Sequence, residues 1–239
     1  LKAFFLRWYG PNNAVLTIGG DLDVDDTLEW VSKYFGSIPR GPEVENADKQ
    51  PAVVSSDRYV TLEDNIRQPM VLVGWPTTYR GEESQASVNA LTNVLGSGSN
   101  SYLYQRLVKT QKAVSAGAFQ DCAELACTMY VYAMGDSGHK GDLTPLYQEM
   151  MQVMGEFEEL GVPQSRLDQI TGMAEADAVF ALQSVRGKVS QLASNETFYG
   201  QPDRIETQLE QIRSVTPESV MDSYQRFVKN KNKVTLSVV

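Results

Sequence analysis

Histidine is nearly absent from this sequence, which has one, His139, in 239 residues. A hydrolytic zinc ion takes three protein ligands, with histidine prominent among them, and leaves a fourth position open. His139 lies in the polar turn DSGHKGD, and no second histidine is present to share a metal ion with it. The residues therefore predict no catalytic residue, no metal site and no cofactor in this chain.

Cysteine is almost as scarce. Cys122 and Cys127 cannot make a structural zinc site alone, because such sites use four ligands. The two residues flank an expected hairpin turn, where their side chains could face each other. We expect instead two small buried side chains, because unpaired cysteine packs as a small apolar residue.

Acidic residues outnumber basic ones, and long apolar runs are lacking. The chain has 21 Lys and Arg against 30 Asp and Glu, a formal net charge of −9. This balance argues against nucleic acid as a partner, since phosphate binding needs clustered basic residues. No stretch approaches the roughly 20 apolar residues that span a bilayer, so we expect no transmembrane segment. The 42% of hydrophobic residues is enough to bury a sizeable core.

The first part of the chain predicts a helix, a strand and a second helix. LKAFFLRWY has helical spacing but no residue that caps its start, which is typical of a helix whose beginning lies upstream. A Gly-Pro-Asn-Asn turn and a strand at 14–18 follow, and then a helix that Asp23 or Asp25 can cap and Gly36 ends. Residues 39–52 form the best candidate for a linker. The expected inward face of the second helix is Leu28, Val31, Tyr34 and Phe35.

The remainder predicts strands first and helices later. The expected strands are 57–64, 68–75, 113–121, 125–134 and 233–239. The expected helices are 82–95, 101–111, 142–160, 163–194, 202–213 and 217–228, and the loop GSGSNS at 96–101 joins the first two. Both ends of the chain repeat one helix–turn–strand pattern at the same spacing, so we expect the tail of one unit followed by a complete second unit.

Taken in order, the motifs YGPNNAVLTIGGDLD, YFGSIP, QPMVLVGWPTTYRGEES and LTNVLGSGSNSYLYQRLVK resemble the M16, or pitrilysin-type, zinc peptidases. The resemblance covers essentially the whole chain and implies an α+β fold, a mostly antiparallel sheet with helices packed on one face. It assigns 1–45 to the C-terminal helix–strand–helix of a preceding domain and 46–239 to a complete second domain. In the family, paired domains form half-shells that enclose a peptide-cleaving chamber.

The chain departs from the family at its chemistry. The H-x-x-E-H zinc helix of the family has no counterpart here, and the resemblance places it upstream, so zinc is expected in the parent protein and not in this chain. Val108 and Val114 stand where the family has an arginine–tyrosine pair that holds the scissile peptide. Chamber-facing roles are suggested for Gly96, Gly98, Ser101 and Arg106.

Two functions follow from the resemblance. The first is a non-catalytic portion of an M16-like zinc metallopeptidase, which walls the peptide chamber and docks the other half. Its partners would be the missing N-terminal domain, an opposite half that is fused or separate, and a peptide substrate. The alternative is a structural or interaction subunit of the same fold that never carried zinc. The resemblance also suggests the bacterial periplasm or cell envelope.

Overall fold

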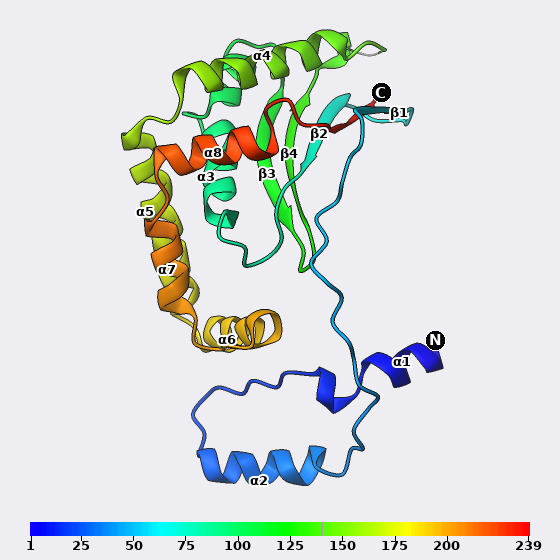
Figure 1. Cartoon of the computed structure of the whole chain (residues 1–239), viewed down its shortest axis with the longest axis vertical. Coiled ribbons are helices and arrows are strands. Elements are labelled where there is room, and N and C mark those ends of the chain that lie inside the picture. The colour runs from blue at the N-terminus through cyan, green and yellow to red at the C-terminus, as the bar shows by residue number, and fades with distance from the viewer. Residues whose placement is uncertain (140) are drawn as a thin grey trace. The chain divides into compact units, whose positions relative to one another are not determined.

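The computed structural model describes residues 1–139 and 141–239. These residues divide into two compact units (Figure 1). Unit 1 contains Leu1–Asp48 and Glu175–Leu209, and unit 2 contains Lys49–Ala174 and Glu210–Val239. No helix in the described ranges is both long and apolar enough to cross a bilayer.

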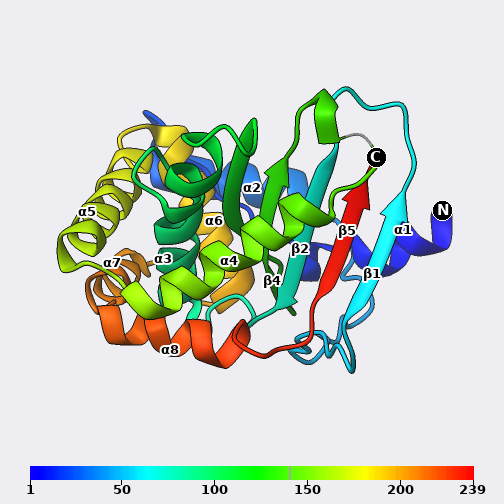
Figure 2. The same cartoon turned by 90° about the horizontal axis from the view of Figure 1, so that it is seen from above.

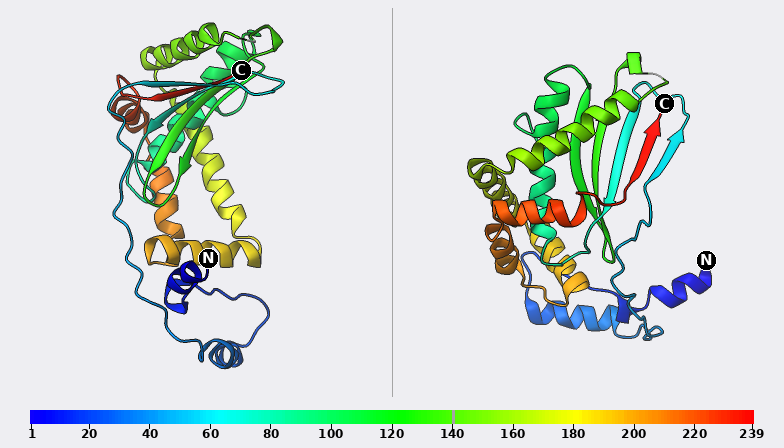
Figure 3. Two further views of the ribbon diagram at one scale, coloured as in Figure 1. Left: turned by 90° about the vertical axis from the view of Figure 1, so that its right-hand side faces the viewer. Right: turned by 45° about the horizontal axis from the view of Figure 1, so that its top comes forward.

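Unit 2 is built on a five-stranded sheet with the order β1-β5-β2-β4-β3. Its strands are β1 (Arg58–Leu62), β2 (Met70–Pro76), β3 (Ser115–Cys122), β4 (Cys127–Met134) and β5 (Val234–Val238). β5 lies between β1 and β2 (Figure 3), parallel to β1 and antiparallel to β2. The other pairs are antiparallel. All five predicted strands are confirmed, each within a few residues of its expected bounds.

One face of this sheet carries the core. Along β4 every second side chain is buried, which is the alternation of a strand that packs on one side only. The same face is buried along β2, where it carries Val71, Val73 and Trp75. Helices α3 (Gln85–Gly96), α4 (Thr144–Leu160) and α8 (Pro217–Phe227) contribute to this core, and α4 crosses the strands in Figure 2. The predicted α+β fold, with helices on one face, is confirmed.

The opposite face of the sheet, which we call the open face, is apolar but not buried. Phe119 of β3 stacks on Tyr130 of β4 with ring centroids 5.1 Å apart, and 45% of Phe119 is exposed. Leu72 and Tyr132 are register partners on this face and are partly exposed. The helices of unit 2 that contribute to the core do so from the other side of the sheet.

The later helices follow the predicted bounds except at one break. α7 (Ile205–Arg213) and α8 are confirmed, and Thr216 caps α8 in a capping box with Ser219. The single helix predicted at 163–194 is wrong, because α5 (Gln164–Ala181) ends and α6 (Val185–Tyr199) begins anew. The Ser184 hydroxyl accepts the amide of Gly187 at 3.0 Å and so starts the second helix.

The α-helix predicted at 101–111, after the glycine-rich loop, is not found as such. Tyr104–Val108 form a π-helical turn, η2. Turns of this type are often found at functional sites.

Cys122 and Cys127 form a disulfide, so the expectation of two unpaired buried cysteines is wrong. They are register partners at the end of the β3–β4 hairpin. Their facing positions bring the sulfur atoms together, as the hairpin spacing allowed.

The first segment of unit 1 contains α1 (Lys2–Trp8), the short turn η1 (Pro11–Asn13) and α2 (Val24–Phe35), and its second segment contains α6. Asp23 caps α2 by accepting the amide of Asp26 at 3.0 Å, as predicted. The strand predicted at 14–18 is wrong, because no strand of the described chain pairs with this segment. Its apolar residues favour an extended backbone, but a strand also needs a neighbour.

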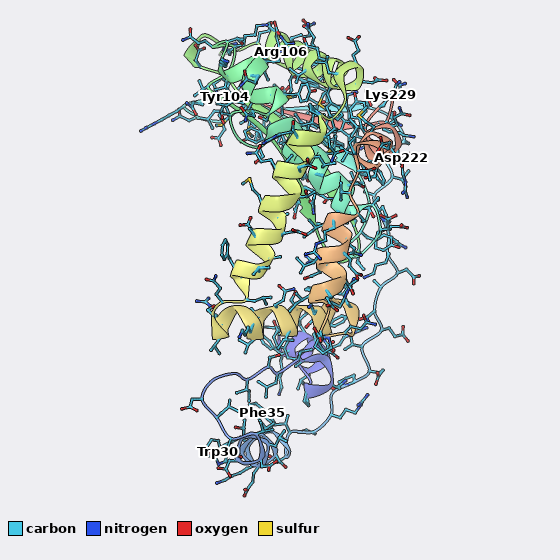
Figure 4. The ribbon with its side chains drawn as sticks, turned by 90° about the vertical axis from the view of Figure 1, so that its left-hand side faces the viewer. Trp30, Phe35, Tyr104, Arg106, Asp222 and Lys229 are labelled. Carbon is cyan, nitrogen blue, oxygen red and sulfur yellow. A yellow bond between two sulfur atoms is a disulfide. The ribbon has the colours of Figure 1, made fainter. Side chains whose placement is uncertain are left out.

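The predicted inward face of α2 is not buried. Leu28, Tyr34 and Phe35 are each more than half exposed, and α2 contains no buried residue. Trp30 and Phe35 are labelled on this helix in Figure 4. The pattern of an amphipathic helix is therefore present, but the described part of unit 1 offers its apolar side chains no core.

Candidate functional site

The loop at 96–101 is built around two glycines that have different roles. Gly96 ends α3 and lies against β3, where an added Cβ would overlap the backbone nitrogen of Ala118. Gly98 has a φ of +72°, which disfavours any residue with a side chain, and space is open around it. Close packing requires glycine at the first position, and backbone conformation favours it at the second.

Ser101 is fully buried and holds this loop together. Its hydroxyl donates to the Gly98 carbonyl at 2.8 Å and accepts the Tyr104 amide at 3.4 Å. Gln105 donates from its side chain to the carbonyl of Ser99. Ser101 therefore supports the loop from inside.

Arg106 lies on η2, which follows the loop, and it is labelled in Figure 4. Its Nε is 2.7 Å from Oε2 of Glu156 on α4, and 54% of its side chain is exposed. Burial raises the pKa of the neighbouring Tyr102 hydroxyl, Arg106 lowers it and Glu156 raises it. The net effect is a raised pKa, so the Tyr102 hydroxyl is protonated at neutral pH and donates to the Gly161 carbonyl at 2.9 Å.

A hollow of about 530 Å³ lies beside the loop, within unit 2, and we call it the arginine hollow. Its polar lining consists mainly of Asn100, Tyr102, Gln105, Arg106, Arg166 and Gln169. The structure thus brings Arg106 and loop residue Asn100 into one site, with Gly96, Gly98 and Ser101 shaping the loop.

Arg166 of α5 is the residue that sequence reasoning missed. One terminal nitrogen donates to the Ser97 carbonyl at 2.6 Å and the other to the side chain of Gln169 at 2.7 Å. These bonds fix the guanidinium between the loop and α5. No motif marks this arginine, because its role depends on a contact with a loop 69 residues away in the sequence.

Val108 and Val114 lie on a second, smaller hollow. Both line the same space of about 270 Å³, together with Lys112 and Asp136. The two positions at which the family places an arginine and a tyrosine therefore line one hollow, but in this chain both are valine.

The described residues do not fit a catalytic zinc ion. Nδ1 of His139 is 2.9 Å from Oδ1 of Asp136, and this hydrogen bond lowers the pKa of the Asp136 carboxyl. Across residues 1–139 and 141–239, no cluster of three or more His, Cys, Asp or Glu side chains could hold a metal ion. The disulfide also occupies both cysteines.

Comparison with known proteins relates the chain to peptidases. The family described as "Peptidase M16 inactive domain" matches residues 1–171. An uncharacterized zinc protease of Mycobacterium leprae is 27% identical over 224 residues, which cover 92% of this chain and 49% of that protein. The chain spans about half the length of the curated relatives it matches.

Solved structures share the fold at low sequence identity. A protease from Helicobacter pylori superposes with a TM-score of 0.84 at 19% identity, covering all of this chain and 58% of the other. The first half of the periplasmic protease PqqL from Escherichia coli gives a TM-score of 0.77 at 17% identity, covering all of this chain and 53% of the other.

Proposed function

This chain belongs to the M16 peptidase family, in which it matches the inactive domain, and we propose that it forms a non-catalytic wall of the peptide chamber of a zinc metallopeptidase. In this proposal, the catalytic zinc belongs to another domain of the parent protein. The present chain shapes the space in which a peptide lies and docks the opposite half of the enzyme.

The open face of the sheet carries this proposal. It presents Phe119, Tyr130 and Tyr132 as an aromatic group beside Leu72, on a sheet whose other face packs against the core over β2 and β4. An apolar face of this kind marks a surface that contacts another protein. Together with the poor fit to a metal ion, it supports a role in walling and docking over a role in catalysis.

The exposed side chains of α2 support a division at about residue 45. We propose that 1–45 complete a preceding domain and that 46–239 form a second domain. Trp30 and Phe35 are each more than half exposed on α2, and the body of a preceding domain would cover such a face. This proposal predicts that α2 becomes protected when that domain is supplied.

The disulfide supports an oxidising compartment. Disulfides persist in the bacterial periplasm and are rare in the cytosol, and the related PqqL structure is of a periplasmic protease. We therefore propose that the bond between Cys122 and Cys127 forms in the cell envelope.

Reconstitution tests the proposed function. The chain, the upstream domain of its parent and the opposite half are purified, and cleavage of an unstructured peptide is measured with each part omitted in turn. We expect zinc-dependent cleavage only when the chain is present with both other parts. Cleavage by the other parts at full rate without the chain would contradict the proposal. No cleavage by the complete mixture would favour a structural subunit.

A pair of leucine variants tests the open face in the same assay. Leu72→Glu places a charge on the open face, and we expect it to weaken docking and lower the cleavage rate. Leu160→Glu makes the same change at an exposed position at the end of α4 and is the matched control. Equal rates for the two variants would remove the open face from the proposal.

A further inference from the structure

The charged lining of the arginine hollow has one sign. Arg106 and Arg166 both line it, and its described lining includes no Asp or Glu. This is unusual in a chain with a net charge of −9. Two guanidinium groups on one concave surface favour an anionic ligand.

Hydrogen bonds hold Arg166 in place, but they use only some of the N–H groups of its guanidinium. A guanidinium has five N–H groups, and its hydrogen bonds to the Ser97 carbonyl and the Gln169 side chain each use one. Its Nε–H is buried and has no hydrogen-bond partner within the described residues. Each terminal nitrogen keeps a second N–H, which is left for an acceptor that enters the hollow that Arg166 lines.

Arg106 supplies a second, more exposed donor group. Its Nε faces Glu156, which orients the side chain from α4. Its two terminal nitrogens make no hydrogen bond to a described residue, so they are available to an acceptor that enters the hollow. One arginine is thus fixed by the loop and the other by a carboxylate outside the lining.

We propose that the arginine hollow binds a carboxylate group of the peptide, through Arg106 and Arg166. Arginine matches a carboxylate with paired, charge-assisted hydrogen bonds. The inference rests on the proposed function, because it takes a peptide as the ligand of the chamber. The carboxylate belongs either to the C-terminus of the peptide or to an acidic side chain.

Three peptides of about ten residues test the site on the intact chain. All are acetylated, flexible and free of other acidic residues. The first ends in a free carboxylate, the second ends in an amide, and the third ends in an amide but contains one Glu. Their binding is measured by calorimetry, and NMR follows the backbone amides of Gly98 and Arg106.

We expect the free carboxylate or the Glu peptide to bind about tenfold or more tightly than the neutral peptide, as charge-assisted hydrogen bonds to arginine imply. A preference for the first peptide identifies a terminal carboxylate, and a preference for the third identifies an acidic side chain. Shifts of the Gly98 and Arg106 amides on binding place the ligand at the hollow.

Arginine variants connect the preference to the two residues. We expect Arg106→Gln and Arg166→Gln to remove it. Arg226→Gln is the matched control, since Arg226 also pairs with a glutamate and is 55% exposed, against 54% for Arg106. Arg166→Lys keeps the positive charge but loses the planar guanidinium that can donate two parallel hydrogen bonds. We expect it to reduce the preference for a carboxylate peptide only in part.

Equal binding of all three peptides, or no binding of any, would overturn the carboxylate site. A preference that survives in both glutamine variants would also overturn it. The reconstitution assay is kept independent of these outcomes by using as its unstructured peptide one that ends in an amide and contains no acidic residue. A chain that supports cleavage but lacks the carboxylate preference keeps the proposed function and loses this inference.

Discussion

Gly96, the last residue of α3, lies directly against the backbone of Ala118 in β3, with no room for a side chain between them. The contact sets how closely the helix approaches the sheet at the start of the glycine-rich loop. The backbone of that loop is therefore positioned by packing as well as by its own hydrogen bonds.

Replacing Gly96 with alanine is expected to lower the free energy of unfolding by about 1–3 kcal/mol, because the added methyl group overpacks a fixed contact. Gly155→Ala is the control. Gly155 lies within α4 with open space around its Cα, so alanine there is expected to add about 0.5–1 kcal/mol. Urea unfolding of both variants measures the difference. An unchanged midpoint for Gly96→Ala would contradict the close contact.

Removing the disulfide is expected to cost about 2 kcal/mol of unfolding free energy, since the bond closes a short loop. The double variant Cys122→Ala, Cys127→Ala is compared with the parent chain in urea, with and without a reductant. The reductant should lower the midpoint of the parent chain and leave the variant unchanged. Equal midpoints for the parent chain under both conditions would show that the bond contributes nothing to stability.

Protonation of the Glu82 carboxylate is expected to lower the free energy of unfolding of unit 2 in acid. Burial raises its pKa, but hydrogen bonds from Ser84 and Thr78 outweigh burial, and the pKa lies below its ordinary value of 4.5. A lowered pKa in the folded state gives stability that is present above pH 4.5 and is lost as pH falls through the folded-state pKa. Glu82→Gln should flatten this dependence and cost about 1 kcal/mol at pH 7.

Urea midpoints between pH 3 and pH 7 test the Glu82 prediction. Glu83→Gln, at the exposed neighbouring position, is the control and should keep the dependence of the parent chain. If Glu82→Gln and Glu83→Gln gave parallel curves, Glu82 would not be the group responsible.

The chain alone is expected to bind no catalytic zinc and to cleave no peptide. His139 pairs with Asp136, and the described residues hold no three-ligand cluster. The purified chain is dialysed against zinc, freed of loosely held metal and assayed for bound zinc and for cleavage of an unstructured peptide. One equivalent of tightly bound zinc, with turnover that a chelator abolishes, would refute the prediction.

Local patterns predicted most of unit 2. β4 alternates buried and partly exposed residues, and α8 begins at Thr216-Pro217, so both could be located from neighbouring residues alone. The break before α6 was missed because its apolar spacing continues that of α5. The signal that could have revealed it is the cap of Ser184 on Gly187.

Features that depend on distant residues were not predictable in this way. The segment 14–18 has the composition of a strand, but pairing requires a neighbour that composition does not supply. Arg166 enters the arginine hollow through a contact with Ser97 that no local pattern signals. The facing of Cys122 and Cys127 was foreseen, whereas the choice between thiols and a disulfide was not.

The position of β5 has a consequence for the order in which unit 2 folds. β1 is made long before its partner in the sheet, β5, because Arg58 pairs with Val234. Such long-range pairing slows folding. During synthesis, β1 stays unpaired until residues 234–238 leave the ribosome. The nascent chain therefore carries an exposed edge until β5 is made, and a chaperone that shields extended segments would act on it there.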